Sequence, residues 1–262
     1  MKKENIIVGT SAWGSRISFR SSVLIGEKLI DNGFSNFDTA PNYGSGLSHH
    51  ILNHLANKKT IIVDTKFGDK YYINLREIIK RIYRFYNSET FIKSFNYLNF
   101  MLPAQDNEFS WNLLNLKNSI SNFENDLNKC KIDTIYLHSP PLGIIDMEYI
   151  ERFNAITKEK KFLSGISWPN KNDLETIKEF SSFFKLQVSL NFFYQHKEFI
   201  LSNFENVSVA GLFKKVRNEK LGNDSINYFM DELSEIFYEK KKYKLIIGIN
   251  SENSIDNLLR YL

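Results

Sequence analysis

Short apolar runs recur along this 262-residue chain, separated by longer segments of mixed polarity. The runs are rich in Val, Ile, Leu and Phe, as is typical of strands that are buried on both faces. The pattern predicts strands at residues 6–10, 34–40, 61–66, 134–138, 162–167, 185–190, 207–212 and 245–250.

The segments between these strands carry apolar residues at helical spacing. In the first of them, Ser21 and Ser22 are predicted to cap a helix that Gly33 ends. Further helices are predicted at residues 47–56, 118–129, 147–158, 171–182, 195–203, 223–240 and 254–262.

Eightfold strand–helix alternation predicts an α/β fold, a closed (β/α)8 TIM barrel that forms a single domain over residues 1–262. The alternative is a doubly wound open sheet, which usually has a glycine-rich phosphate turn after its first strand. Here that turn runs from Gly9 to Gly14 and does not fit the G-x-G-x-x-G pattern. Its sequence therefore favours the barrel.

A long insertion after the third strand, at about residues 67–111, interrupts the alternation. It is rich in Tyr and Phe, and residues 75–86 within it are predicted to be helical. Segments of this length often act as lids or binding loops. We interpret its aromatic residues as packing for the insertion, with a sugar-binding platform as the open alternative.

Composition and charge narrow the class of protein. A net charge of +4 is too small to indicate nucleic-acid binding, but it suits an anionic ligand such as a dinucleotide. Lysines 240–242 and 244 are interpreted as a solvated helix end. Cys130 is the only cysteine, which excludes an internal disulfide. No apolar stretch approaches the ~18–20 residues of a membrane span, and no signal peptide is expected, so a cytoplasmic location is predicted.

Polar residues at successive strand ends carry the candidate chemistry. Asp38, Lys66 and His138 end the second, third and fourth predicted strands, and Tyr43 follows Asp38 on a loop. In a barrel these ends meet at one mouth. A phenol has an ordinary pKa of about 10, and a nearby ammonium lowers it by stabilising the phenolate. A carboxylate can hold that ammonium and a histidine can orient a carbonyl, so the set predicts a tuned proton transfer.

Three segments around these residues resemble the aldo-keto reductase family, in particular its sugar and aldose dehydrogenases. They are residues 38–48 (DTAPNYGSGLS), residues 65–66 (TK) and residues 132–140 (IDTIYLHSP). The resemblance implies a (β/α)8 barrel in which Tyr43 is the general acid–base. It further implies that Lys66 and Asp38 tune the tyrosine and that His138 orients the substrate.

The same resemblance implies a site for NADP(H) or NAD(H) without a Rossmann fold. The residues expected to contact the cofactor are Ser167, Gln187, Gly211, Leu212, Gly248, Asn250 and Ser251. Trp13 and Trp168 follow strands at the same mouth and are predicted to form a substrate wall, with core packing as the alternative for Trp13.

The chain departs from the family pattern in its cofactor segments. Residues 251–254 contain no Arg or Lys for a 2′-phosphate, and Trp168 stands where the family usually has Asn. Family habit favours NADP, whereas the missing basic residues favour NAD. His49 replaces the usual Glu. His50 and His54 lie four residues apart, but no carboxylate completes a set nearby, so no metal is expected.

These observations predict an NAD(P)-dependent oxidoreductase that interconverts a carbonyl and an alcohol on a sugar or a similar small polar compound. Two alternatives stay open. One is a non-catalytic barrel that senses the cofactor. The other is a non-redox lyase or isomerase that uses the same tyrosine as its base. A small-molecule partner is expected, and neither nucleic acid nor a membrane.

Overall fold

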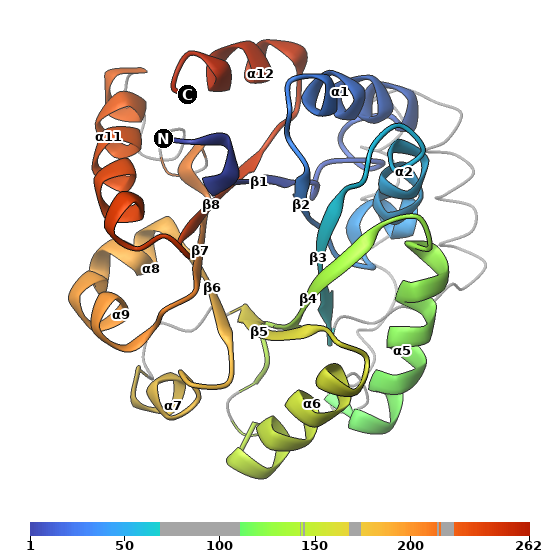
Figure 1. The fold of residues 1–262 in the computed structure, drawn as a ribbon, viewed down its shortest axis with the longest axis vertical. Coiled ribbons are helices and arrows are strands. Elements are labelled where there is room, and N and C mark those ends of the chain that lie inside the picture. The colour runs from blue at the N-terminus through green and yellow to red at the C-terminus, as the bar shows by residue number, and fades with distance from the viewer. Residues whose placement is uncertain (69–110, 142, 144, 168–173, 214, 216–222) are drawn as a thin grey trace, which may run out of the picture.

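Eight parallel strands close into a barrel in the computed structural model of the chain (Figure 1). Each strand pairs with the next, and β8 pairs with β1. The structure describes residues 1–68, 111–141, 143, 145–167, 174–213, 215 and 223–262. The strands are β1 (Ile6–Gly9), β2 (Asn36–Asp38), β3 (Ile62–Phe67), β4 (Lys131–His138), β5 (Leu163–Ser167), β6 (Lys185–Ser189), β7 (Val207–Ala210) and β8 (Lys244–Gly248).

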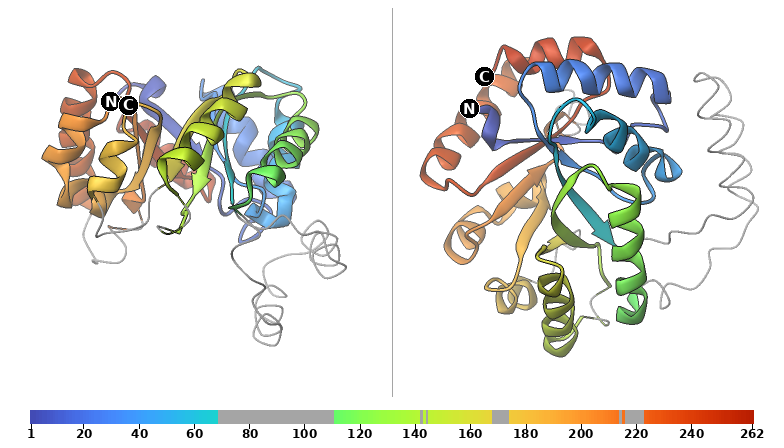
Figure 2. Two further views of the ribbon diagram at one scale, coloured as in Figure 1. Left: turned by 90° about the horizontal axis from the view of Figure 1, so that it is seen from below. Right: turned by 45° about the vertical axis from the view of Figure 1, so that its right-hand side comes forward.

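Helices surround this barrel, and the two termini lie close together (Figures 1 and 2). The arrangement confirms the predicted (β/α)8 fold, because an open sheet would leave β1 and β8 unpaired. The helices are α1 (Phe19–Asp31), α2 (Leu47–Leu55), α5 (Leu113–Asp126), α6 (Met147–Glu159), α7 (Leu174–Glu179), α8 (Leu190–Gln195), α9 (Lys197–Asn203), α11 (Asn223–Glu239) and α12 (Glu252–Leu259), with short 3-10 helices η1 (Lys3–Asn5) and η2 (Tyr43–Gly46). None of the helices in the described ranges is long and apolar enough to cross a membrane.

Some predicted boundaries are wrong because capping side chains override the hydropathy pattern. Helix α1 begins earlier than predicted, since Ser18 accepts a hydrogen bond from the backbone N–H of Ser21. Strand β6 ends at Ser189, whose side chain caps α8 by accepting from the N–H of Phe192. Helix α8 therefore lies almost wholly in residues for which no helix was predicted, and the helix predicted at residues 195–203 corresponds to α9.

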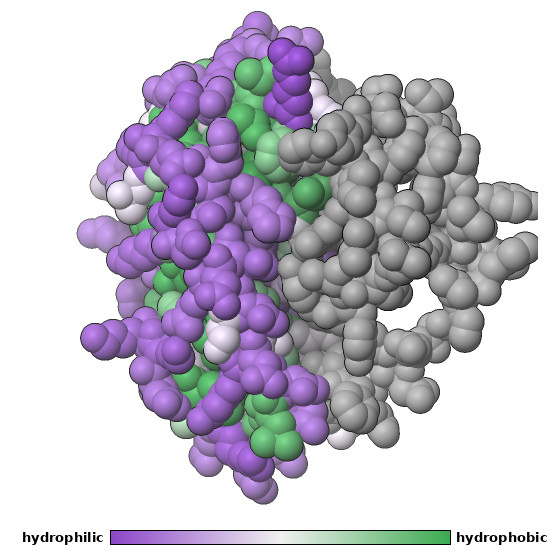
Figure 3. Space-filling model, turned by 90° about the vertical axis from the view of Figure 1, so that its right-hand side faces the viewer, coloured by the Kyte–Doolittle hydropathy of each residue, from purple (hydrophilic) through white to green (hydrophobic). Residues whose placement is uncertain are grey.

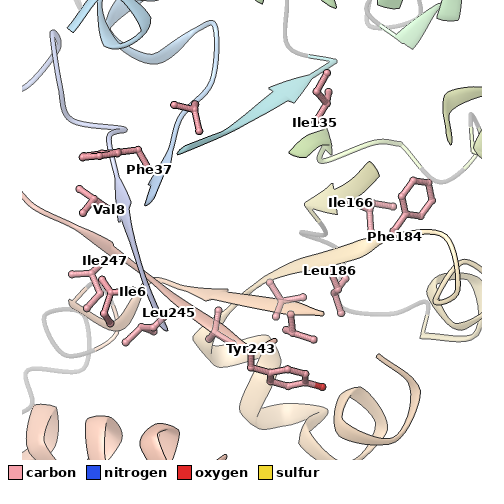
Figure 4. Close-up of a cluster of buried hydrophobic side chains, with 14 of the residues drawn as sticks. Ile6, Val8, Phe37, Ile135, Ile166, Phe184, Leu186, Tyr243, Leu245 and Ile247 are labelled. Atoms are coloured by element: carbon pink, nitrogen blue, oxygen red, sulfur yellow. The ribbon is translucent and has the colours of Figure 1, made fainter. Parts of the chain in front are cut away.

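The main hydrophobic core lies between the strands and the surrounding helices. Side chains that alternate along the strands fill it, and Figure 4 shows a cluster of them from β1, β2, β4, β5, β6 and β8. Phe184 and Tyr243, each just before a strand, join this cluster. On the face shown in Figure 3, hydrophilic residues cover most of the described surface, with smaller apolar groups between them.

The intervening strand positions make the barrel interior polar. Barrels of this kind usually fill their centre with branched apolar side chains. Here the buried polar residues of the strands include Asp38, Asp64, Lys66, Thr134, Gln187 and Ser208. Tyr136 is fully buried among them and lies over Gly165, where a Cβ atom would come within 2.4 Å of the Tyr136 ring. Glycine is therefore required at this close approach.

The carboxyl group of Asp64 is perturbed by its position in this interior. Burial raises the pKa of its carboxyl to about 6, with Asp133 and Asp38 adding to the shift and Lys185 opposing it. Burial alone would also raise the pKa of Asp133, but the hydrogen bond and charge of Lys185 bring it below the ordinary value. The two neighbouring carboxyl groups are therefore shifted in opposite directions.

Replacing Asp64 with Asn should stabilise the protein at neutral pH. Its pKa is raised on folding, so the stability linked to its proton is present below about pH 4 and lost as the pH rises through about 6. Ionisation then opposes folding by up to roughly 3 kcal/mol, at about 1.4 kcal/mol per pKa unit. Thermal unfolding should show a gain for Asp64→Asn at about pH 7.5 that disappears at about pH 4.

Asp133→Asn is the matched control. The pKa of Asp133 is lowered in the folded protein, so the expected change in stability has the opposite sign. The substitution should reduce stability at about pH 7.5, and that loss should fade as the pH falls through the carboxyl's folded-state pKa. If Asp64→Asn is less stable than the unmodified protein at about pH 7.5, ionisation of Asp64 does not oppose folding.

The two ends of the predicted insertion contact each other at the rim of the barrel. Strand β3 ends at Phe67, whose ring meets that of Trp111 at 6.2 Å between centroids. Trp111 is buried, and its carbonyl accepts a hydrogen bond from Tyr149 of α6. Residues 69–110, which contain most of the predicted aromatic insertion, lie outside the described residues.

Candidate active site

A buried ion pair joins the C-terminal ends of β2 and β3. The Lys66 ammonium donates to both carboxylate oxygens of Asp38, each at 2.7 Å, and to the carbonyl of Thr39 at 2.9 Å. The Lys66 side chain is 2% exposed and that of Asp38 is 7% exposed. Both charges are therefore removed from water, and each depends on the other for compensation.

A network of three hydroxyl groups fixes the backbone around Asp38. Ser48, in the first turn of α2, lies 2.6 Å from the Thr10 hydroxyl and 2.9 Å from that of Thr39. Thr10 also donates to the carbonyl of Asp38 at 3.0 Å. The network ties β1, β2 and α2 together. The sequence alone does not indicate this network, because a threonine at a strand end carries no distinctive local signal.

Tyr43 stands on η2, a tight turn between β2 and α2. Three consecutive residues, Gly44, Ser45 and Gly46, have positive φ angles of 58°, 57° and 89°. A Cβ atom at Gly44 would come within 2.5 Å of the Trp13 carbonyl, so only glycine fits there. The turn reverses the chain directly after Tyr43 and leaves its side chain half-buried.

The structure brings Tyr43 together with Lys66 and His138. The Lys66 ammonium lies 5.1 Å from the centre of the Tyr43 ring. The ring of His138, the last residue of β4, meets the Tyr43 ring edge-on, with 6.5 Å between centroids. All four residues of the predicted set therefore lie at one mouth of the barrel.

The charge state of Lys66 follows from its surroundings. Burial alone would lower the pKa of its ammonium, but the charge of Asp38 and the interactions with Asp38 and Tyr43 outweigh it. The pKa therefore lies above its ordinary value, and Lys66 stays protonated at neutral pH. A fixed positive charge next to the phenol favours the phenolate over the neutral form.

Gln187 also reaches this site. It lies on β6, and its side-chain amide donates to the Asp38 carboxylate at 2.8 Å. This residue is predicted to contact a nicotinamide, and in the structure its amide nitrogen also holds the Asp38 carboxylate. Ser167, half-buried at the end of β5, is paired in register with both His138 and Gln187.

The ends of β7 and β8 carry the glycines of the predicted cofactor segment. Among the described residues, no heavy atom apart from those of the adjacent residues lies within 4 Å of a Cβ position built on Gly211 or Gly248, so the backbone of both glycines is open on that side. Asn250 and Ser251 are exposed beside it, whereas Leu212 is buried and offers only its backbone. This open, glycine-lined backbone fits the cofactor segment predicted from the resemblance.

Helix α12 begins at this end, with Ser251 accepting a hydrogen bond from the N–H of Ser254. A helix N-terminus favours an anion. One cation near this end is Lys28 of α1, whose ammonium lies 3.5 Å from Glu252 and 2.9 Å from Asp256. The sequence does not indicate Lys28 as a neighbour, because more than two hundred residues separate it from α12 along the chain.

The two tryptophans predicted to line the substrate site differ in outcome. Trp13 is fully buried, packs against Phe37 and donates its indole N–H to the carbonyl of Ile249 at 3.1 Å. Its position favours the core-packing alternative over a substrate wall. Trp168 lies outside the described residues.

His49, which departs from the family pattern, is fully buried on α2. Its ring lies 3.3 Å from the Thr65 hydroxyl and 3.6 Å from a carboxylate oxygen of Asp126. It therefore packs behind β3, next to the residue that precedes Lys66. Within the described part of the chain, no group of three or more His, Cys, Asp or Glu side chains could hold a metal ion.

Comparisons with known proteins agree with this geometry. A family model described as "Aldo/keto reductase family" matches residues 5–210. The aldo-keto reductase AKR11C1 from Bacillus halodurans, in its holo form, is 15% identical, with a TM-score of 0.67 over 98% of this chain and 86% of that one. The glycerol dehydrogenase AKR11B4 from Gluconobacter oxydans is 17% identical, with a TM-score of 0.58 over 80% and 60% of the two chains. A comparison with curated protein sequences gives no match.

Proposed function

The chain belongs to the aldo/keto reductase family, and from that premise we propose that Tyr43 transfers the proton when a sugar or a similar small polar substrate reacts. Family membership makes the protein an NAD(P)-dependent oxidoreductase that interconverts a carbonyl and an alcohol. The observation that carries the proposal is the contact of Tyr43 with a buried, charge-compensated Lys66.

Each residue of the site has a distinct part in the proposed proton transfer. In the reductive direction, the Tyr43 hydroxyl gives its proton to the carbonyl oxygen as that oxygen gains electron density. The Lys66 ammonium stabilises the phenolate left behind, and Asp38 keeps Lys66 charged and in position. His138, at the edge of the Tyr43 ring, hydrogen-bonds the same substrate oxygen. Oxidation uses the same groups in reverse.

The cofactor site is proposed at the ends of β5 to β8. Bound NAD(P) supplies or accepts the hydride. Ser167 and Gln187 would lie at its nicotinamide end, and Gly211, Leu212, Gly248, Asn250 and Ser251 would hold the phosphates through backbone and small polar groups. The open side of the Gly211 and Gly248 backbone supports this placement.

The choice of a sugar-like substrate rests on two observations. The motif around Tyr43 resembles that of sugar and aldose dehydrogenases, and one similar structure is a glycerol dehydrogenase. The mouth is bounded by charged and hydroxyl groups, namely Asp38, Lys66, Tyr43 and His138, which suit a substrate with several hydroxyl groups.

Nicotinamide absorbance tests the proposed reaction. The protein should oxidise NADPH or NADH when small aldehydes and aldoses are supplied, or reduce the oxidised form when polyols are supplied. Nucleotide binding without turnover on this panel would favour the cofactor-sensing alternative. Substrate conversion without any change in absorbance would instead favour a lyase or isomerase.

A further inference from the structure

A cavity of about 340 Å³, lined by both apolar and charged residues, lies at the N-terminal end of the barrel. Its wall includes the first residues of six strands, namely Asn36, Ile62, Leu163, Lys185, Val207 and Lys244. Asp38, Lys66 and His138 lie at or near the opposite ends of their strands. The cavity therefore does not belong to the active site, and its volume is within the range of about 300–1,000 Å³ usual for small-molecule sites.

The cavity exists because polar side chains occupy interior positions. Branched apolar residues normally fill this part of a barrel. Here Asp64 of β3, Lys185 of β6 and Ser208 of β7 line the space instead. Asp64 is only 8% exposed and Ser208 only 6%, so the polar wall extends well inside the barrel.

The wall carries an excess of positive charge. Four lysines line it, Lys185, Lys241, Lys242 and Lys244, against two carboxyl groups, Asp64 and Asp133. Lys185 donates to Asp133 at 2.6 Å and to the Thr134 hydroxyl at 2.8 Å, so its ammonium is fixed in place. The sequence analysis interpreted the lysine run before β8 as a solvated helix end, and the structure adds that three of its members line this cavity.

A second hollow of about 770 Å³ adjoins the first and shares Leu163, Lys185, Asn206 and Lys242 with it. It adds the half-buried rings of Phe162 and Phe183 and the ammonium of Lys158. Glu205 lies in its wall and pairs with Lys242 at 2.9 Å. Phenylalanine and lysine side chains in one wall suit a flat ring that carries a phosphate.

We propose that this end of the barrel binds a small phosphorylated metabolite, no larger than a mononucleotide. The phosphate lies in the smaller cavity, with Lys241 and Lys244 as its cationic contacts and the fixed ammonium of Lys185 behind them. A ring attached to the phosphate extends into the adjoining hollow, toward Phe162 and Phe183. The inference does not depend on the proposed reaction, because no residue of the active site lines either space.

Calorimetric titration of the full chain with inorganic phosphate and with AMP tests this site. Both should bind saturably at low ionic strength, and AMP more tightly because it adds a ring. Lys244→Gln should weaken both by about tenfold or more, as expected for the loss of a charge-assisted contact. Thermal unfolding of the variant confirms that it is folded.

Ser251→Asp is the matched control, three residues beyond the other end of β8. It keeps an N-cap acceptor for α12 but adds a negative charge where the cofactor phosphates would bind. The phosphate and AMP binding that depends on Lys244 should not change in this variant. If neither probe binds, or if Ser251→Asp abolishes binding while Lys244→Gln leaves it intact, the site is not at this end of the barrel. Equal affinities for AMP and phosphate would contradict the proposal that the ring of the ligand binds in the second hollow.

Sulfate adds a pH test, because its charge is constant between about pH 5.5 and 7.5. The groups that act on the Asp64 carboxyl are Asp38 of β2, Asp133 and Thr134 of β4 and Lys185 of β6. Tyr136 of β4 is also coupled to it. Protonation of Asp64 removes a negative charge from the wall, so sulfate affinity should rise severalfold toward the lower pH. Asp64→Asn should remove most of that rise, and an unchanged pH dependence would contradict the proposed anion position.

Discussion

Replacing Tyr43 with Phe should lower kcat by about 10²–10⁴-fold, the usual contribution of a positioned general acid–base. The substitution removes one oxygen and keeps the ring that meets His138 edge-on. Lys66 keeps its bonds to Asp38 and Thr39, so the site should hold its shape. The loss should therefore be in turnover, measured from nicotinamide absorbance at saturating substrate, while nucleotide affinity by fluorescence stays the same.

Tyr238→Phe is the matched control for this change, because its side chain is 81% exposed and lies on α11, outside the site. Its turnover should equal that of the unmodified protein. A Tyr43→Phe enzyme with unchanged kcat would show that another group moves the proton and would remove the role proposed for Tyr43.

Replacing Lys66 with Met should both abolish turnover and destabilise the fold. Asp38 would keep its charge in a buried position without its main partner, and breaking a buried pair from one side typically costs about 3–5 kcal/mol. In a chain of this size the melting temperature should fall on the order of 10 °C. The same change removes the positive charge that stabilises the Tyr43 phenolate, so activity should fall together with stability.

Two further variants test whether the loss of stability comes from the unpaired, buried carboxylate of Asp38. Lys58→Met breaks the ion pair with Glu27 at 2.8 Å, but Lys58 is exposed, so its melting temperature should hardly change. Adding Asp38→Asn to Lys66→Met removes the uncompensated charge and should restore much of the stability, but not the activity. A Lys66→Met protein as stable as Lys58→Met would contradict the burial argument.

The contact between Gln187 and Asp38 could not be predicted from residue type alone. Its amide lies on the Asp38 carboxylate, across the barrel from β6 to β2 and 149 positions away in sequence. Such a contact depends on strand tilt and register, which no local pattern encodes. Lys28 beside α12 and the hydroxyl network of Thr10, Thr39 and Ser48 have the same origin.

The eight strand–helix units and the residues that end β2, β3 and β4 could be predicted from local hydropathy, because hydropathy period and strand ends are local properties. Asp38, Tyr43, Lys66 and His138 were therefore predicted correctly as neighbours. That Trp13 packs in the core, that Gln187 holds Asp38 and that lysines line a cavity at the N-terminal end of the barrel became clear from the folded structure alone. The physical reason is that closing the sheet sets which interior side chains meet, and that closure depends on all eight strands at once.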